Sequence, residues 1–492
     1  MSLPISTSAI TLADGLSREF LLHHRCCPIA LGDDGTVLVA VAPDYVRDAL
    51  DDIAVSYNRR AISQDTAGDE VVRLIERLTT RADRAIELER GSIDAQEDDT
   101  ADVRDLARQP PVVRYVNLLV RDAYEAHASD IHLEATRHGL SARFRLDGVL
   151  VPALEPPAEL HHAIVSRIKL LAELDIAERR RPQDGRIRVR LDETELDLRV
   201  STVPTMFGES VVLRLLDRGS RPAELEALGM NASMLATLDH LVTRPHGMLL
   251  VTGPTGSGKT TTLYASLSRR PKSTEKIVTV EDPVEYQLPD VTQVPVHRQA
   301  GVTFATALRS ILRQDPDVIM IGEMRDAETA EIAVQAAMTG HLVFSTLHTN
   351  DALSAIPRLL DLGVPEYLVA ATVEGVLAQR LVRRVCDGCR SSYESDPSHV
   401  AALTGRPSGR VTLQRGLGCS ACRFTGFQGR VGIFELLELT DEIKDAVLTG
   451  TGRRSLRARA EAAGFLPMRR DGWDKVQAGL TTIDEVLRVV QH

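Results

Sequence analysis

Residues 253–260 read Gly-Pro-Thr-Gly-Ser-Gly-Lys-Thr and fit the phosphate-loop pattern Gly-x-x-x-x-Gly-Lys-Ser/Thr in full. In such a loop the glycines let backbone N–H groups turn inward around phosphate oxygens. Lys259 can then reach the outer phosphates of a nucleotide, and the Thr260 hydroxyl can bind Mg²⁺. An apolar run at 248–252 precedes the loop and a helical run follows it, so a glycine-rich turn without a ligand is disfavoured. The residues predicted to hold the nucleotide are Gly253, Pro254, Thr255, Gly256, Ser257, Gly258, Lys259 and Thr260.

Polar side chains follow three other apolar runs, at 277–280, 318–321 and 342–347. In chain order they are Glu281, Asp282 and Glu285, then Glu323, and then His348. In open α/β sheets ligands bind outside the carboxyl ends of the strands. We therefore expect all three groups to face the phosphate loop.

The acidic residues among them are candidates for hydrolytic chemistry. A hydrolytic ATPase needs an acid that holds Mg²⁺ and a carboxylate that orients the attacking water. Glu323, at the Walker B position, is the first candidate for the water or metal role, and Glu285 is the second. Glu281 and Asp282 are weaker candidates, because Pro283 makes Asp282 a plausible turn former.

Histidines and arginines are candidates for contact with the γ-phosphate. The sequence fits His348 equally to a γ-phosphate sensor and to a core or hydrogen-bonded histidine, and His341 leaves the same choice. A hydrolytic site commonly recruits arginine to neutralise charge in the transition state, although surface ion pairing is the ordinary role of an arginine. The residue pattern alone does not choose between these roles for Arg199, Arg214, Arg309 and Arg313.

Four of the six cysteines form two Cys-x-x-Cys pairs, Cys386 with Cys389 and Cys419 with Cys422. Four thiolates suit a closed tetrahedral Zn²⁺ site that leaves no position open for catalysis. In a reducing compartment such pairs indicate a metal rather than disulfides. Buried thiols without a metal are the alternative. The adjacent Cys26 and Cys27 are predicted to be core thiols.

The order of apolar runs predicts an α/β protein of several domains. Between 227 and 384 strand-like runs alternate with helical stretches, which indicates a parallel sheet. Residues 87–105 hold eight acids and two arginines without an apolar period, which is typical of a solvated linker. Outside the core, periodicity predicts strands at 37–41, 141–146 and 195–200, and helices from 45 and over 112–126, 441–448, 453–463 and 482–490.

These patterns divide the chain into seven parts. The predicted parts are an N-terminal domain (1–85), an acidic linker (86–110), an α/β domain (111–217), a hinge (218–226), the phosphate-loop domain (227–384), a tetracysteine module (385–425) and a mainly helical C-terminal domain (426–492).

Composition restricts where such a protein works. The formal net charge of −11 over 492 residues argues against a general binder of nucleic-acid backbones. The N-terminus lacks a basic segment followed by an apolar one, and no window of 18 apolar residues occurs. We therefore expect a cytoplasmic protein whose membrane contacts come through a partner.

Together these motifs resemble those of the secretion ATPases of type II secretion systems and of the related type IV pilus assembly ATPases. The resemblance covers nearly the whole chain. In an ordinary P-loop ATPase an aspartate would usually stand where Glu323 ends its strand, but a glutamate is expected in this family. The segments that carry the resemblance are 128–134 (Ala-Ser-Asp-Ile-His-Leu-Glu), 181–186 (Arg-Pro-Gln-Asp-Gly-Arg), 253–260, 281–285, 312–317, 322–326, 339–348 and 379–382.

The resemblance implies a RecA-like P-loop core and, before it, a PAS-like domain that clamps the nucleotide. It implies catalytic roles for Glu285 and Glu323 and a histidine box from His341 to His348. The arginines that reach toward phosphate in the family match Arg199 and Arg214 in the clamp domain and Arg309 and Arg313 in the core. ATP, Mg²⁺ and Zn²⁺ are the cofactors expected from it.

Partners are also implied by the resemblance. A homohexamer is expected, whose N-terminal domain binds the cytoplasmic part of an inner-membrane secretion protein. An inner-membrane platform protein is a second expected partner, and the chain would be peripheral to the inner membrane. Its function would be to drive pseudopilus assembly and protein export through a type II secretion system.

Other functions remain as alternatives. A pilus assembly ATPase is the nearest, although such chains usually carry more than the roughly 110 residues found here before the clamp domain. Retraction ATPases normally lack both the N-terminal domain and the tetracysteine module. A hexameric nucleic-acid motor is disfavoured by the acidic charge and the lack of an aromatic-basic stripe, so no nucleic-acid partner is expected. A nucleotide-binding scaffold without turnover is disfavoured because the strand-end groups are present.

Overall fold

The computed structural model describes residues 16, 18–31, 36–47, 49–57, 59–76, 78, 109–191, 194–217, 224–407 and 409–490. The chain forms two compact units, Met1–Asp217 with Leu417–Gly426, and Arg218–Gly416 with Phe427–His492. The predicted linker lies outside the described residues except for 109 and 110, and so do residues 218–223 of the predicted hinge.

The N-terminal part of the first unit has a sheet and core of its own. Its elements are α1 (Arg18–His24), β1 (Cys26–Leu31), β2 (Thr36–Val41), α2 (Ala49–Tyr57) and β3 (Arg60–Asp65), with β2 central between antiparallel β1 and parallel β3. Leu21 and Ile53 from the two helices pack with the sheet. Cys26 and Cys27 are buried in this core, and burial raises the pKa of the Cys26 thiol to about 11. The prediction of core thiols is therefore confirmed.

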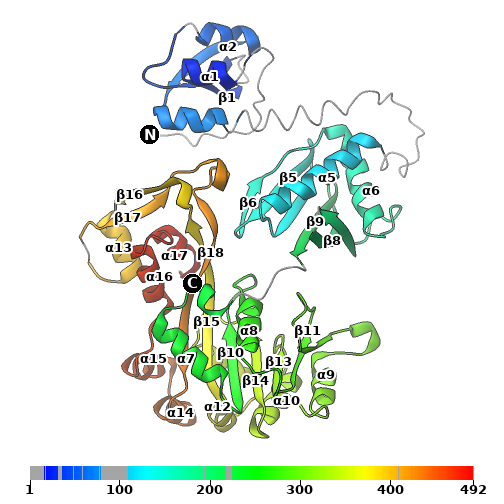
Figure 1. The fold of residues 1–492 in the computed structure, drawn as a ribbon, viewed down its shortest axis with the longest axis vertical. Helices are drawn as coiled ribbons and strands as arrows, with labels where there is room; N and C mark the ends of the chain where they lie inside the picture. The colour runs from blue at the N-terminus through cyan, green and yellow to red at the C-terminus, as the bar shows by residue number, and fades with distance from the viewer. Residues whose placement is uncertain are drawn as a thin grey trace. The chain divides into compact units, whose positions relative to one another are not determined.

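A six-stranded antiparallel sheet follows in the first unit, with strand order β6-β5-β4-β9-β8-β7 (Figure 1). Alternate residues such as Ile131, Phe144 and Leu198 point to one face and pack against Tyr115 of α5 and Ile164 of α6. The opposite face carries charged residues. The elements are α5 (Pro110–Glu125), β4 (Asp130–Thr136), β5 (Gly139–Leu146), β6 (Val149–Pro152), α6 (His161–Leu171), β7 (Gln183–Leu191), β8 (Thr194–Thr205) and β9 (Gly208–Asp217).

The second unit is built on a seven-stranded sheet of order β12-β11-β13-β14-β10-β15-β18 (Figure 1). Its strands are parallel except β18, which is antiparallel to β15. Along β10, Met248 and Leu250 enter one core and Leu249 and Val251 another, so this strand is buried on both faces. The strands are β10 (Gly247–Thr252), β11 (Ile277–Glu281), β12 (Thr292–Pro295), β13 (Val318–Ile321), β14 (Leu342–Leu347), β15 (Val373–Val385) and β18 (Phe427–Glu438).

Helices surround this sheet and complete the second unit. Within the core they are α7 (Ala232–Val242), α8 (Lys259–Ser268), α9 (Phe304–Ile311), α10 (Ala327–Met338), α11 (Ala355–Asp361) and α12 (Glu366–Thr372). A two-stranded pair, β16 (Arg390–Glu394) and β17 (Thr412–Gly416), encloses α13 (Pro397–Thr404) in the chain. The chain then ends with α14 (Asp441–Leu448), α15 (Arg453–Ala462), α16 (Met468–Gln477) and α17 (Ile483–Val490).

Most elements predicted from periodicity are confirmed within a few residues, and β13, β14 and α14 match their predicted bounds. The helix predicted to start at 45 begins only at Ala49. Strand β18 was not predicted, although helices do follow it. Its buried stretch, residues 432–435, consists of a short apolar run that ends in a glutamate, and so short a run does not distinguish a buried strand from a buried helix.

Candidate functional site

The phosphate loop lies between β10 and α8, as its sequence context predicts. Strand β10 is paired in parallel with β14 on one side and β15 on the other. Helix α8 begins at Lys259, directly after Gly258, which has a left-handed φ of 87°. The first backbone N–H groups of a helix have no acceptor within the helix, so they are available to an anion held by the loop.

Close approach of β15 requires glycine at two loop positions. A Cβ on Gly253 would lie 2.5 Å from the carbonyl oxygen of Gln379 and 2.6 Å from Ser257 Oγ. A Cβ on Gly258 would lie 2.7 Å from Gln379 Nε2. The Gln379 side chain is buried and accepts a hydrogen bond of 2.6 Å from Thr262 Oγ1 of α8. Gln379 therefore forms one wall of the loop.

The loop contains polar groups that suit a phosphate. Ser257 Oγ is buried and has no hydrogen-bond partner among the described residues. The Lys259 ammonium donates to the carbonyl oxygens of Gly253, at 2.8 Å, and Pro254, at 3.0 Å. Burial lowers the pKa of Lys259 to about 8, an effect that Glu323 opposes and Arg380 reinforces. A half-buried cation and a buried, unsatisfied hydroxyl both gain from an anion in the loop.

Glu323 and His348 meet at the ends of adjacent strands β13 and β14. Glu323 Oε2 lies 3.4 Å from His348 Nε2 and 2.6 Å from Arg325 Nε. The Glu323 side chain is 13% exposed, whereas that of His348 is 43% exposed. His348 is therefore not a core residue, and the geometry brings it together with Glu323 at the edge where the phosphate loop lies.

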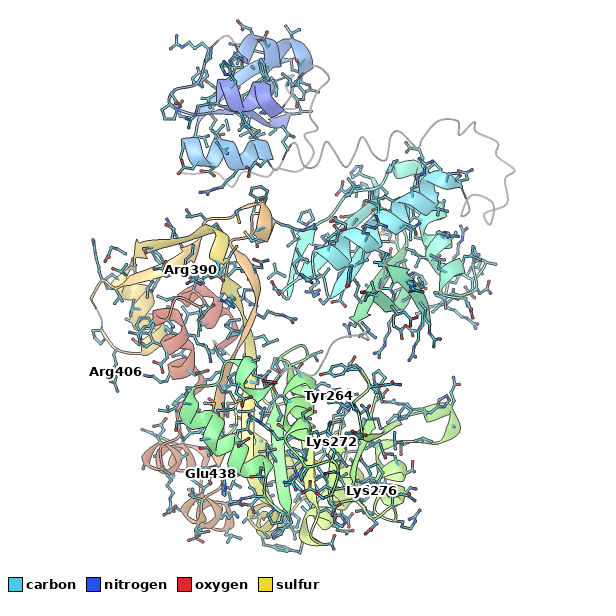
Figure 2. The ribbon with its side chains drawn as sticks, viewed as in Figure 1. Tyr264, Lys272, Lys276, Arg390, Arg406 and Glu438 are labelled. Carbon is cyan, nitrogen blue, oxygen red and sulfur yellow. The ribbon has the colours of Figure 1, made fainter. Side chains whose placement is uncertain are left out.

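Glu281, by contrast, is engaged in packing. Its buried carboxylate accepts hydrogen bonds from Thr279 Oγ1 at 2.5 Å, from Gln293 Nε2 at 3.1 Å and from the hydroxyl of Tyr264. Tyr264 lies on α8 (Figure 2), and its burial together with its bond to Glu281 raises its pKa. Glu281 thus attaches the helix of the phosphate loop to β11, which leaves it no free oxygen for a ligand in this arrangement.

The remaining strand-end candidates differ in their surroundings. Asp282 lies 3.3 Å from the Arg298 guanidinium, and Glu285 is half-buried in the same segment after β11. His341 Nδ1 lies 2.9 Å from the carbonyl oxygen of Ala336, at the end of α10. His341 therefore has a hydrogen-bond partner at the end of α10. This contact agrees with the predicted role of a hydrogen-bonded structural histidine.

The four candidate arginines belong to two different units. Arg309 on α9 lies 2.6 Å from Glu328, and Arg313 donates to the carbonyl oxygen of Arg309 at 2.9 Å, both in the unit of the phosphate loop. Arg199 on β8 and Arg214 on β9 are directly opposite each other in the first unit. Arg214 also binds Asp130 Oδ1 at 2.9 Å, yet its side chain remains 57% exposed.

Two residues of β15 line the loop but had no predicted role. Gln379 packs against Gly253 and Gly258, and Arg380 influences the pKa of Lys259. They belong to the segment 379–382, which carried part of the family resemblance. Their proximity depends on β15 pairing with β10, and local sequence does not reveal that pairing. Arg325, beside Glu323, was missed for a different reason, since it resembles any exposed arginine.

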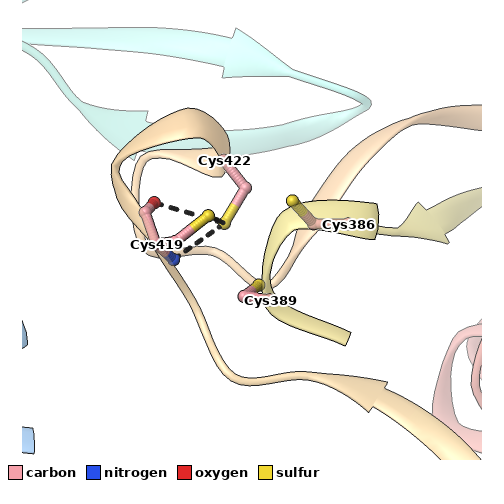
Figure 3. A group of neighbouring side chains, drawn as sticks. All are labelled: Cys386, Cys389, Cys419 and Cys422. Carbon is pink, nitrogen blue, oxygen red and sulfur yellow. Dashed lines mark hydrogen bonds between the residues drawn. The ribbon is translucent and has the colours of Figure 1, made fainter. Parts of the chain in front are cut away.

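The four cysteines of the two Cys-x-x-Cys pairs gather in one group (Figure 3). The sulfur atoms of Cys386, Cys389, Cys419 and Cys422 all lie within 4.8 Å of one another. Backbone N–H groups of Cys419 and Gly426 donate to Cys422 Sγ at 3.2 and 3.3 Å. Such donors stabilise a thiolate, and four converging sulfurs fit a tetrahedral metal site.

No helix among those that the structure describes is both long enough and apolar enough to cross a membrane.

Known proteins share both the sequence and the fold. A family model described as "Type II/IV secretion system protein" matches residues 105–488. A "Type II secretion system protein E" of Xanthomonas campestris pv. campestris is 47% identical over 483 residues, which cover 97% of this chain and 85% of that protein. The "Type IV pilus assembly ATPase PilB" of Myxococcus xanthus is 45% identical over 402 residues, 80% of this chain and 71% of that protein.

Among solved structures, the pilus retraction motor PilT with bound ADP is similar to this chain. The TM-score is 0.50 and the sequence identity 27%, and the match covers 75% of this chain and 95% of PilT.

Nucleotide binding should weaken as the pH rises through about 8. The pKa of Lys259 is about 8 without a ligand, and bound phosphate oxygens favour the charged form and raise this pKa. Binding between about pH 8 and 9 should therefore take up a fraction of a proton per site. Isothermal titration calorimetry with ATP in two buffers of different ionisation enthalpy measures this uptake.

Lys259→Arg is the control for this measurement, because a guanidinium stays charged over the whole range. Its binding should show no proton uptake from this position. Equal uptake by the wild type and the arginine variant would contradict the assignment.

Proposed function

Because the chain belongs to the type II/IV secretion system protein family, we propose that it is a cytoplasmic ATPase whose homohexamer drives pseudopilus assembly and protein export through a type II secretion system. The observation that carries the hydrolytic part is the arrangement of Lys259, Glu323 and His348 at one edge of the sheet. A binding scaffold would need the lysine loop but not a carboxylate and a histidine beside it.

The phosphate loop binds ATP through its backbone N–H groups, Ser257 and Lys259. The Thr260 hydroxyl would hold Mg²⁺, which would neutralise charge on the outer phosphates. Glu323 is screened from bulk water and contacts His348, which suits it to orient the attacking water or to support the metal. His348 is exposed enough to reach the γ-phosphate, and Glu285 is a second carboxylate for the same edge.

Arginines of the clamp domain, Arg199 and Arg214, neutralise charge on the phosphates when they reach an ATP-loaded loop. Support comes from a row of residues opposite one another across five strands of the antiparallel sheet. In sheet order the row is Arg145, Asp130, Arg214, Arg199 and Arg186. Like charges directly opposite each other destabilise a sheet, and Arg199 and Arg214 form such a pair. An anionic ligand removes this repulsion. Arg309 on α9 and Arg313, shortly after the end of that helix, serve the same purpose.

Zn²⁺ is held by Cys386, Cys389, Cys419 and Cys422 as a structural ion. The converging sulfurs support this assignment, and four protein ligands leave no open position for catalysis. The ion connects two segments that are far apart in the sequence, and it thereby stabilises the tetracysteine module, 385–425. This module is one of the seven parts into which we divide the chain.

Assembly and location complete the proposal. The N-terminal domain, 1–85, binds the cytoplasmic part of an inner-membrane secretion protein, and an inner-membrane platform protein receives the mechanical work. The separate core of this domain supports an independent binding role. The chain is thus peripheral to the inner membrane.

A type IV pilus assembly ATPase is the second candidate, because the PilB of Myxococcus xanthus is also a close relative. Pull-down of the first 100 residues against inner-membrane components of both systems separates the two.

Glu323→Gln should retain ATP binding and lose turnover. The amide keeps the shape of the side chain but cannot act as a base, so kcat should fall about 10²- to 10⁴-fold. Phosphate release and binding of a fluorescent ATP analogue measure the two effects. Glu331→Gln, on the exposed face of α10, is the matched control. Near wild-type turnover in Glu323→Gln would refute the site, and lost ATP binding would make Glu323 chiefly a metal-site residue.

Cys386→Ser should lower the zinc content from one ion per chain, because a three-thiolate site binds the ion more weakly. Elemental analysis of the purified chain measures it, and Cys26→Ser, a core thiol outside the group, should leave the zinc content unchanged. A wild-type protein without zinc would end the metal assignment.

Mixing two inactive variants tests whether an arginine acts between subunits. Lys259→Ala subunits keep their arginines, and Arg214→Ala subunits keep their phosphate loop. If Arg214 serves a neighbouring subunit, the mixture should regain ATP hydrolysis at mixed junctions, since loss of such an arginine costs roughly a thousandfold or more. A mixture that stays inactive at every ratio would exclude the action of Arg214 between subunits.

A further inference from the structure

Four consecutive residues directly after His348 are each held by a different element of the second unit. The residues are Thr349, Asn350, Asp351 and Ala352, and the elements are β10, β15, α15 and β18. Residues 349–352 are called the junction below. It begins at the catalytic edge of the sheet and leads into α11.

The first half of the junction is attached to the strands beside the phosphate loop. The Thr349 N–H donates to Thr252 Oγ1 at 2.9 Å, and Thr252 is the last residue of β10 before the loop. Asn350 Oδ1 accepts a hydrogen bond of 3.0 Å from Arg380, the same guanidinium that lowers the pKa of Lys259. These two contacts link the junction to β10 and β15, the two strands beside the phosphate loop.

The second half is attached to the C-terminal helices. Asp351 Oδ2 lies 2.5 Å from the Arg453 guanidinium, at the start of α15. The Ala352 N–H donates to Glu435 Oε1 at 2.7 Å. The other oxygen of Glu435 accepts a hydrogen bond of 2.9 Å from the N–H of Met468, the first residue of α16. Glu435 is buried, so one carboxylate joins the junction and α16 away from water.

We propose that Glu435 and Asp351 are positioning residues for ATP hydrolysis, through which α15 and α16 set the place of His348 and thereby the turnover rate. The inference rests on the proposed ATPase function. A carboxylate uses both oxygens to bridge two backbone N–H groups, and neither group has water as an alternative partner. A displacement of α15 or α16 therefore moves the junction. His348, one residue away, must keep its place beside Glu323 for the chemistry, and small misplacements at a reacting centre reduce the rate.

The exposed pair Arg453–Asp351 provides a test that does not depend on stability. Its arginine side chain is 58% exposed, and exposed ion pairs contribute little to stability. Arg453→Ala should lower kcat roughly threefold to tenfold, as substitutions along such networks do, with KM and binding of an ATP analogue unchanged. Arg453→Lys should recover part of the lost rate because it restores a cation.

The matched control is Arg470→Ala. Arg470 pairs with Asp474 at 3.2 Å on α16, is equally exposed at 60%, and does not contact the junction in the described structure. Its kcat should equal that of the wild type. Wild-type kcat in Arg453→Ala, or an equal loss in both variants, would overturn the inference.

A second pair of variants tests the buried bridge. Glu435→Gln keeps the volume of the side chain but has one carbonyl oxygen for two N–H groups, so it holds only one partner at a time. Its kcat should fall at least as much as that of Arg453→Ala. Glu485→Gln is the control, because Glu485 is also buried and accepts a hydrogen bond of 3.0 Å from the Arg383 N–H, but forms no hydrogen bond to the junction in the described structure.

The outcomes separate this inference from the function on which it rests. A purified wild-type chain that hydrolyses no ATP at any protein concentration defeats the proposed function itself. An active wild type in which Glu485→Gln loses as much turnover as Glu435→Gln, or in which Arg453→Ala is unaffected, defeats only the positioning role. If Glu435→Gln does not fold, the Arg453 series decides alone.

Discussion

The site depends on the register with which β10 lies between β14 and β15. Thr252, at the end of β10, pairs with Leu347 on one side and with Ala378 on the other. The next residue of each strand is therefore at the same level, and these residues are Gly253, His348 and Gln379. A shift of one residue would turn every side chain of β10 to the opposite face, because the side-chain period of a strand is two. Parallel pairing thus brings the phosphate loop, the histidine and the glutamine together.

Hydrogen-bond partners then give acidic residues in similar sequence positions different functions. Glu281 and Glu323 both follow apolar runs at the same edge of the sheet. Three neutral donors occupy the oxygens of Glu281, which makes it a structural contact between α8 and β11. Glu323 instead contacts cationic or titratable side chains at the edge, with Arg325 the nearest. Partners rather than position along the strand determine which acid remains available for chemistry.

The sequence was sufficient to predict the features that depend on residues close together in the chain. The phosphate loop, the buried strands before the polar residues and the paired cysteines depend on short spacings, and the structure has them where they were predicted. Contacts that depend on distant pairing were not predictable. Gln379 and Arg380 reach the loop only because β15 pairs with β10 across more than one hundred residues, and β18 joins the sheet only because β15 offers it an edge. The hydrogen bonds to the Glu281 carboxylate were likewise not predictable, because Tyr264 and Gln293 donate them from other elements.

Hydrogen bonds connect Lys259, the start of the phosphate loop and the junction in one series. The Lys259 ammonium donates to the carbonyl oxygens of Gly253 and Pro254 in its own loop. The loop begins directly after Thr252, whose hydroxyl is bonded to the backbone of Thr349. These bonds form one continuous series, which is the physical basis of the coupling proposed above. Since the junction continues through Ala352 to Glu435, this path ends at the C-terminal helices rather than at the surface of the loop.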